Sequence, residues 1–300
     1  MKILYIRDIC DIGTILVSEA RRKNIKANVI NYLWGDDGFY FKSNYRIIKF
    51  FELLSFSIRN RLLNFDIYHF NYPSSTFLPN NKDIILLKKL GKKVFVHYHG
   101  DDIRNQKEKE ILKKVDGKFV STPDLEQFVP DAEWVPLPYN IRDMKKRKGW
   151  NDTLRIIHAP TDRNKKGTIH ILRAIKELKK SYNIDFELIE GKPNFYVMQK
   201  MAMADIVIDQ IGPGWYGKVT IEALYCGAVS CFYMDPDLSN IISINPFVSI
   251  TKRNITNKIA ELIEDDSLRN ELRAKGYKYI EKYHDSKQIM ERLIRIYRNV

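Results

Sequence analysis

The sequence predicts an α/β protein with two similar domains and a C-terminal helix. Short runs rich in β-branched residues alternate with stretches long enough for helices, which is typical of parallel sheets with helical crossovers. The alternation stops near residue 140 and starts again near residue 154. The chain has 300 residues. This length is enough for two domains of the usual size, about 100 to 150 residues each, with a hydrophobic core in each.

Five short apolar runs in the first half are predicted to be strands. They cover residues 2–6, 27–31, 66–70, 93–99 and 118–121. Parallel sheets bind their ligands at the carboxyl ends of the strands, so the residues after each strand are the first candidates for a site.

After Tyr139 the chain continues as a polar run without apolar periodicity, which we interpret as a linker over residues 141–152. The predicted domains are therefore residues 1–140 and 153–284. The second domain repeats the alternation. Its predicted strands are 154–158, 185–190, 205–209, 228–233 and 247–250, and its predicted helices are 168–182, one from about residue 218, 255–264 and 267–283.

Two helices are periodic enough to predict their buried faces. Thr168 is a good N-cap for the helix over 168–182, whose apolar face is formed by Ile171, Leu172, Ile175, Leu178 and Tyr182. A break at residues 284–286 precedes the last helix, 285–300, whose apolar stripe is Ile289, Leu293, Ile296 and Tyr297. At this spacing each stripe is a packing face rather than a cofactor contact.

Composition excludes several classes of protein. The net charge of +13 lies mostly in the first 150 residues and attracts anionic partners such as nucleotide phosphates, acidic lipid or nucleic acid, although solvated lysine-rich helix faces explain it equally well. Three cysteines cannot form a disulfide framework and show no zinc-ligand spacing, so we expect a cytoplasmic protein without a bound metal. Residues 2–6 are too short for a signal peptide, and 47–58 are too short to span a bilayer.

A cationic loop follows the first strand of the second domain. Arg163, Lys165 and Lys166 lie between that strand and the next helix. Backbone N–H groups and the positive end of a helix dipole favour a phosphate at such a place, and an arginine can bind it through two parallel hydrogen bonds. The alternative is a solvated basic loop without a ligand.

A glycine-rich turn follows the strand over 205–209. Gly212, Gly214 and Gly217 surround Trp215 and Tyr216, and glycines allow the backbone to approach a ligand closely. The amides of Lys218 and Val219 would point from a helix start toward a phosphate or sugar, with Glu222 one turn further on. A carboxylate in a first turn is also a common stabiliser of the helix dipole.

These residues carry a resemblance to a known family. GWYGKVTIEALYCGAV, residues 214–229, resembles the donor-site segment of GT-B glycosyltransferases of the glycosyltransferase-4 type, in which a Glu-Gly-Phe-Gly-like turn leads to a Glu-Ala helix. Residues 161–178 are similar to the family's Arg…Lys-Gly loop and the helix after it. The resemblance covers nearly all of 154–300, and extends more loosely to the first domain through residues 65–73 and 91–102. It implies two Rossmann-like domains facing across a cleft, with the C-terminal helix packing back toward the first domain.

The resemblance also implies roles for single residues. Arg163 and Lys166 would hold the diphosphate of a nucleotide sugar, beside Gly217 and Lys218, and Glu222 would bind the ribose. The further residues implied at the donor are Trp215, Tyr216 and Val219, with Gly191 expected near the base. Gly214 stands where the family has a glutamate. Asp209 or Gln210 could supply a substitute contact, or could be strand-end residues that make only local bonds.

In the first domain, His99 ends a strand and matches the family's active-site histidine. A histidine there can hydrogen-bond a sugar hydroxyl, with Asp101 or Asp102 fixing its tautomer, and we predict His99 and Asp101 as catalytic residues. His97 is expected on the other face of the sheet. Gly13, in the loop after the first strand, is a further candidate for a close approach to the donor or acceptor.

The resemblance implies a glycosyltransferase that retains anomeric configuration and needs no metal, with a UDP- or GDP-linked sugar as donor and no cofactor. We expect a cell-surface or lipid-linked glycan as acceptor. A nucleic-acid base is the competing acceptor, and a catalytically inactive binding subunit is the competing class. The basic and apolar residues of 46–63 and the cations of 142–148 suggest contact with an acidic membrane surface at the inner face, although a core helix with charged ends explains 46–63 as well.

Overall fold

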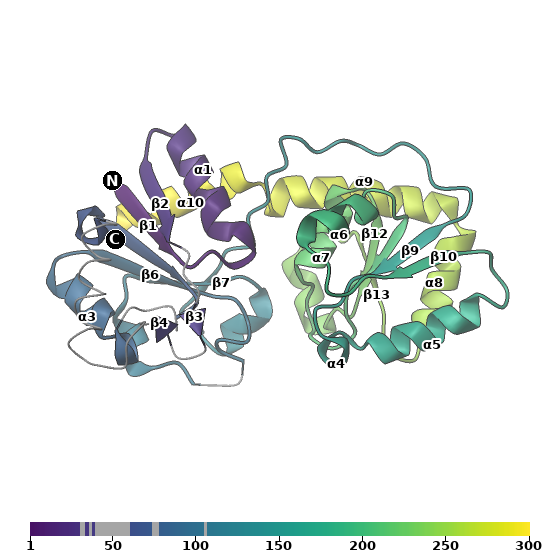
Figure 1. Ribbon diagram of the computed structural model, residues 1–300, viewed down its shortest axis with the longest axis horizontal. Helices are drawn as coiled ribbons and strands as arrows, with labels where there is room; N and C mark the ends of the chain where they lie inside the picture. Colours follow the sequence, from purple (N-terminus) through teal and green to yellow (C-terminus); the bar gives the residue numbers. More distant parts are fainter. Residues whose placement is uncertain (31–33, 36–37, 40–60, 74–77, 105–106) are drawn as a thin grey trace. The chain divides into compact units, whose positions relative to one another are not determined.

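The computed structural model describes the whole chain except residues 31–33, 36–37, 40–60, 74–77 and 105–106 (Figure 1). The chain forms two compact units. Unit 1 comprises Met1–Tyr139 and Ser286–Val300, and unit 2 comprises Asn140–Asp285. Each unit is built on a parallel sheet with its own core.

Unit 1 contains a parallel sheet in the order β2-β1-β5-β6-β7-β8. Its strands are β1 (Lys2–Ile6), β2 (Lys26–Ile30), β5 (Ile67–Asn71), β6 (Lys93–Tyr98), β7 (Gly117–Val120) and β8 (Glu133–Trp134). Helices α1 (Ile12–Arg22) and α3 (Lys82–Lys89) lie between strands, and β3 (Trp34–Gly35) pairs with β4 (Gly38–Phe39) in an antiparallel hairpin. Short 3-10 segments are η1 (Ile9–Asp11), η2 (Leu62–Asn64), η3 (Pro79–Asn81), η4 (Glu110–Lys114) and η5 (Pro123–Gln127).

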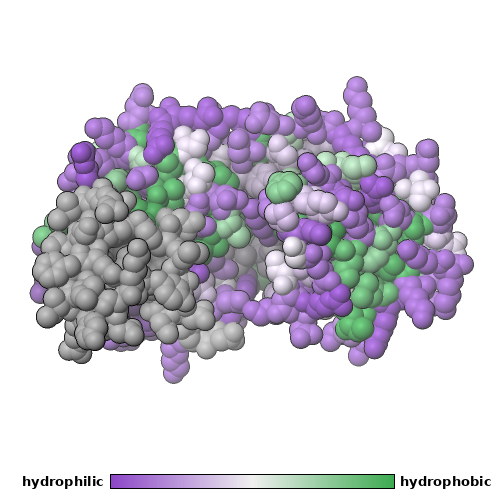
Figure 2. Space-filling view, in the orientation of Figure 1, coloured by the Kyte–Doolittle hydropathy of each residue, from purple (hydrophilic) through white to green (hydrophobic). Residues whose placement is uncertain are grey.

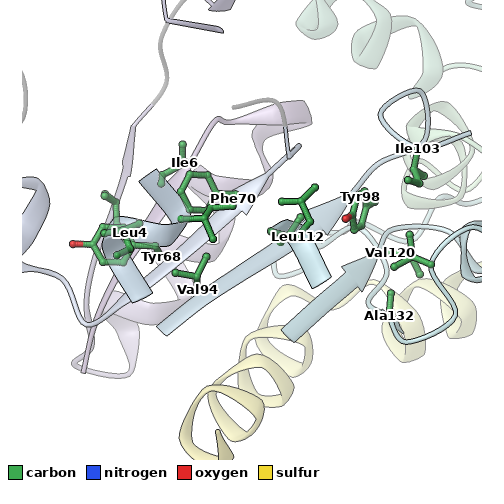
Figure 3. Packing of buried hydrophobic residues seen from close by; sticks show 14 of the residues in the cluster. Leu4, Ile6, Tyr68, Phe70, Val94, Tyr98, Ile103, Leu112, Val120 and Ala132 are labelled. Atoms are coloured by element: carbon green, nitrogen blue, oxygen red, sulfur yellow. The ribbon is translucent and has the colours of Figure 1, made fainter. Parts of the chain in front are cut away.

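The sheet of unit 1 has a hydrophobic core on each face, because successive strand residues point to opposite sides. Leu4 and Ile6 belong to one cluster with Phe70 and Val94, part of which is seen in Figure 3. The neighbouring residues Ile3 and Tyr5 belong to the other cluster. The buried faces of α1 and the C-terminal helix complete that second cluster. The core therefore depends on residues from both ends of the sequence.

The last helix, α10 (Ser286–Asn299), packs on unit 1 as expected. Its buried residues are Ser286, Ile289, Met290, Leu293, Ile294 and Tyr297. The predicted stripe was therefore too narrow: it lacked Met290 and Ile294 and included Ile296, which is only partly buried. A helix that fills a groove between a sheet and α1 buries a wider arc than a helix with one neighbour.

Unit 2 contains a parallel sheet in the order β10-β9-β11-β12-β13. Its strands are β9 (Arg155–His158), β10 (Asp185–Leu188), β11 (Ile206–Ile208), β12 (Val229–Phe232) and β13 (Phe247–Ser249). Its helices are α4 (Arg163–Lys166), α5 (Thr168–Leu178), α6 (Asn194–Met201), α7 (Lys218–Tyr225), α8 (Ile255–Glu264) and α9 (Asp266–Tyr283), with a 3-10 segment η6 (Pro236–Ile241). Ile156 faces the core made with α5, α8 and α9, whereas Ile157 faces the core made with α6 and α7.

Every predicted strand is present, with its ends shifted by one or two residues at most. The two-residue strands β3, β4 and β8 were missed because runs so short show no alternation of apolar and polar residues. Thr168 is not an N-cap: Gly167, at φ 72°, holds that position, and the Thr168 hydroxyl bonds to buried His158 instead. The α/β fold class with two Rossmann-like sheets is confirmed.

The segment that we predicted as a linker packs against unit 2. Buried Asp205 accepts hydrogen bonds from Arg147 and from the side chain of Asn151, each at 2.7 Å. The guanidinium of Arg273 lies 3.3 Å from the centre of the Trp150 ring. Residues 147–151 are thus held to unit 2 by the Arg147–Asp205 ion pair, by the hydrogen bond from the Asn151 amide to Asp205, and by the cation–π contact between Arg273 and Trp150.

The surface of the described residues is mostly hydrophilic on the face shown in Figure 2. Within the described ranges, every helix is too short or too polar to cross a bilayer. The predicted membrane contact at 46–63 lies largely outside the described residues.

Candidate functional site

The candidate donor site is built at the carboxyl edge of the sheet of unit 2. β9 ends at His158, and α4 starts five residues later because Asp162 accepts hydrogen bonds from the amides of Asn164 and Lys165. Gly167 ends this single turn in the left-handed conformation, which glycine adopts without steric cost. The turn places Arg163 and Lys166 together on the edge of the sheet.

Lys166 lies at the centre of a polar cluster. Its ammonium group is 2.6 Å from Asp209 Oδ1 and 2.6 Å from Gln210 Oε1. The other oxygen of Asp209 accepts the Gly217 amide at 2.8 Å and the Thr220 hydroxyl at 3.1 Å. Asp209 is buried, so its charge depends on donors such as these for compensation. It therefore positions Lys166 and the start of α7 relative to one another.

Position 217 requires a glycine, because Lys166 and Asp209 lie close to its backbone. A Cβ atom at Gly217 would lie 3.1 Å from Lys166 Nζ and 3.3 Å from Asp209 Oδ2. Gly217 is also the N-cap of α7, so the positive end of the helix dipole and an ammonium group meet at one point. This combination suits an anion such as a diphosphate.

Glu222 lies in α7 and is nearly fully buried. One carboxylate oxygen accepts a hydrogen bond from the Asn194 amide at 2.8 Å and lies 3.5 Å from the Lys218 ammonium. Burial raises the pKa of Glu222, which Asn194 and Lys218 partly offset. The sequence did not identify Asn194, because the N-terminus of α6 carries no motif.

Arg163 is largely exposed at the rim of the site. It forms two hydrogen bonds with the carboxylate of Glu190, the residue that precedes Gly191. A Cβ atom at Gly191 would meet nothing within 4 Å, although its φ of 62° favours glycine. A ligand near Arg163 would therefore compete with Glu190, a partner that the sequence did not predict.

The side chains of Trp215 and Tyr216 point into the core of unit 2. Trp215 is 1% and Tyr216 is 6% exposed. The Tyr216 hydroxyl bonds to Tyr279 at 2.6 Å and to His284 at 2.9 Å. Tyr216 therefore anchors the glycine-rich turn to α9, and only its backbone is placed to contact a donor.

The glycine-rich turn packs against its neighbours too closely for side chains. A Cβ atom at Gly212 would lie 2.8 Å from the backbone oxygen of Lys165, and one at Gly214 would lie 2.7 Å from Asp235 Cβ. Asp209 and Gln210, the substitute contacts considered for Gly214, are already engaged with Lys166, and Gln210 also donates to the Trp215 carbonyl.

The candidate site of unit 1 lies at the carboxyl edge of its sheet. His99 follows β6, and both of its ring nitrogens are buried without a hydrogen-bond partner among the described residues. Burial, with His97, His69 and Arg7 nearby, holds the pKa of His99 well below its ordinary value. A neutral imidazole can both donate to and accept from a hydroxyl group.

The expectation for His97 was wrong. Its ring stacks on that of His99, with ring centres 4.4 Å apart, and the ring of His69 lies 5.6 Å from that of His97. Residues two apart in an extended chain share a face, which places both histidines on the same side of β6. Burial lowers the pKa of His97 to about 3, so it packs as a neutral ring.

The two acidic residues after His99, Asp101 and Asp102, differ in their surroundings. Asp102 accepts hydrogen bonds from the amides of His99 and Gly100, at 3.0 and 2.7 Å, rather than orienting the His99 ring. Asp101 is exposed at the start of the same turn. Its catalytic role stays a prediction, as does that of His99.

Two further residues at this edge were not identified from the sequence. Arg7 follows β1 and Tyr72 follows β5, and the Arg7 guanidinium lies 4.4 Å from the centre of the Tyr72 ring. Both have positive φ, 69° and 84°, which is strained for residues with side chains. Gly13 instead has a packing role: a Cβ atom there would lie 2.6 Å from Val29 Cγ2.

The fold is that of the GT-B glycosyltransferases, two Rossmann-like α/β units in one chain. The chain is similar to sucrose-phosphate synthase from Thermosynechococcus elongatus, with a TM-score of 0.69 and 12% identity over 100% of this chain and 99% of that one. It is similar to trehalose-6-phosphate synthase, with a TM-score of 0.67 and 11% identity over 99% of each chain.

A third similar structure is the pneumococcal O-GlcNAc transferase GtfA in complex with UDP and GlcNAc. Its TM-score is 0.55 and its identity 13%, over 80% of this chain and 58% of that one. Neither a family model nor a curated protein matches the sequence. Similarity at these identities concerns the fold, so function is argued from the sites.

Proposed function

We propose that the protein is a glycosyltransferase that binds the diphosphate of a nucleotide sugar at Lys166, Gly217 and the start of α7. The observation that carries the proposal is the cluster in which Asp209 holds the Lys166 ammonium beside the Gly217 amide. An ammonium group, a helix N-terminus and glycine-lined backbone are the elements that bind a diphosphate. The GT-B fold and the UDP bound by one similar enzyme support the same function.

The chemistry requires stabilisation of a leaving group. As the bond between the anomeric carbon and the diphosphate oxygen breaks, negative charge grows on the diphosphate, and Lys166 with the amides of α7 can stabilise it electrostatically. We propose retention of configuration, in which the acceptor hydroxyl attacks from the side that the diphosphate leaves. The proton of that hydroxyl then passes to the leaving phosphate oxygen, so no metal is needed to balance the step.

The remaining roles follow from this arrangement. Glu222 would accept ribose hydroxyl hydrogen bonds with the oxygen that Asn194 and Lys218 do not occupy. His99, whose buried ring nitrogens have no hydrogen-bond partner in the part of the chain that the structure describes, would bind a hydroxyl of the sugar or acceptor. We propose a cell-surface or lipid-linked glycan as acceptor and a cytoplasmic location, with contact to an acidic membrane surface through basic residues.

Nucleotide binding to charge-removing variants tests the donor site. Titration calorimetry with UDP and GDP is expected to give at least 10-fold weaker binding for Lys166→Ala, and turnover about 100-fold lower, because one preorganised cation is lost. Arg163→Ala should have a smaller effect, since Arg163 is exposed and shared with Glu190. Lys176→Ala, on the exposed face of α5, is the matched control.

Unchanged binding in Lys166→Ala would overturn the proposed donor site. Nucleotide binding without hydrolysis or transfer of any donor would favour a catalytically inactive binding subunit. Salt-sensitive binding of duplex DNA, together with transfer to it, would favour a nucleic-acid acceptor.

A further inference from the structure

Asp235 occupies the space beside the glycine-rich turn that a side chain at position 214 would need. It follows β12 at the carboxyl edge of the sheet, where its amide donates to the Gly214 carbonyl at 2.9 Å. A Cβ atom at Gly214 would lie 2.7 Å from Asp235 Cβ and 3.4 Å from Asp235 Oδ2. The side chain of Asp235 therefore lies where a side chain at position 214 would begin.

Two neighbouring acceptors at this edge, Asp209 and Gln210, are committed to protein donors. Asp209 accepts from Lys166, Gly217 and Thr220. Gln210 uses its oxygen for Lys166 and its amide for the Trp215 carbonyl.

Asp235 differs from Asp209 and Gln210 in how its two carboxylate oxygens are used. Oδ1 accepts the Asp237 amide at 3.0 Å as the cap of η6, whereas Oδ2 accepts no hydrogen bond within the described part of the chain. Its side chain is partly exposed. An ionised carboxylate beside the anion site would repel a phosphate but would accept hydrogen bonds from neutral hydroxyl groups.

We propose that Asp235 binds hydroxyl groups of the transferred sugar and thereby contributes to the choice of donor. The inference rests on the proposed function, because it takes the diphosphate to lie at Lys166 and Gly217. Gly212 is exposed, and Gly214 and Gly217 are partly exposed, so the turn between that cluster and Asp235 is open to solvent on one side although neighbouring groups pack against the other. A sugar attached to the diphosphate can extend along this turn until its hydroxyls meet the carboxylate.

The proposal predicts an effect that depends on the sugar and not on the nucleotide. Titration calorimetry would compare UDP with UDP-glucose and UDP-N-acetylglucosamine, and GDP with GDP-mannose, for the unaltered protein, Asp235→Asn and Asp235→Ala. A hydrogen bond from a neutral hydroxyl to a charged acceptor contributes about 10- to 100-fold in affinity. We expect that loss for the preferred nucleotide sugar and unchanged affinity for its free nucleotide.

Two controls separate this role from a structural one. Asp235→Asn retains an oxygen that can cap η6, and Asp237→Asn removes the same charge two residues away on the exposed side of η6. Asp237→Asn should bind both ligands like the unaltered protein. Melting temperatures would show whether each variant is folded.

Every other outcome overturns the proposal. Equal affinities for all variants would show that Asp235 does not contact the sugar, and parallel losses for nucleotide and nucleotide sugar would show a structural role. An unaltered protein that binds no nucleotide at all would overturn the proposed function itself, and the inference with it.

Discussion

Asp102 lies in the loop after β6 and is 4% exposed. Burial raises the pKa of its carboxyl group to about 6, from an ordinary value of 3.8, although the amides of His99 and Gly100 donate to it. The folded protein therefore binds this proton more tightly than the unfolded chain. The stabilising contribution is complete below pH 3.8 and is lost as the pH rises through 6.

A comparison with Asp102→Asn measures this contribution, since the amide does not titrate. Two pKa units correspond to about 3 kcal/mol. The free energy of unfolding of the unaltered protein, relative to the variant, should fall by up to about that amount between pH 4 and pH 7.5. Urea denaturation at the two pH values, followed by circular dichroism, provides the test. A difference that is the same at both would show that burial does not perturb Asp102.

The sequence can identify a functional residue when the role of that residue follows from its position after a strand. Lys166 and Gly217 each follow a strand of unit 2, and the structure brings both to Asp209. It could not identify Asp235, because the contact with Gly214 depends on which strands are neighbours in the sheet. Nor could it predict that Tyr216 points inward, since the direction of a side chain in an irregular turn has no periodicity.

Helix α10 shows what the sequence predicts about an element. Its existence and its packing face follow from the apolar spacing, but the width of that face depends on its neighbours. Leu293 is fully buried in the core of unit 1, whereas Ile296, also aliphatic and in the same helix, is only partly buried.

Leu293 and Ile296 allow a comparison of two matched substitutions. Leu293→Ala should lower the free energy of unfolding of unit 1 by about 2 to 5 kcal/mol, because it leaves a cavity among side chains that can relax only in part. Ile296→Ala should cost less than about 1.5 kcal/mol, since partial exposure reduces both the apolar area lost and the cavity. Chemical denaturation of both variants tests this order. Equal losses would mean that α10 does not complete the core of unit 1.

At the scale of the whole molecule, the chain enters unit 2 at Asn140 and returns to unit 1 at Ser286. Unit 1 is thus discontinuous in sequence, and its second core needs Leu293 and Tyr297 of α10 together with residues of β1 and α1. Unit 2 is continuous, and Asp205 and Arg273 hold the segment 147–151 to it. Sequence periodicity places the boundary between the units near residue 140, but the ion pair that holds this segment forms between residues 58 positions apart.

The two units should therefore differ when they are produced separately. A fragment of residues 140–285 contains its complete sheet, its two cores and the Lys166 cluster, so it should fold cooperatively and bind the same nucleotide as the whole chain. Residues 1–139 lack α10 and expose the apolar face that this helix covers, so they should be unfolded or aggregated. Adding α10 after residue 139 through a flexible linker should restore a folded unit 1 without nucleotide binding. Circular dichroism melting and titration with UDP or GDP test the three fragments. Nucleotide binding by the repaired unit 1, or its absence from a folded 140–285 fragment, would place the donor site outside unit 2.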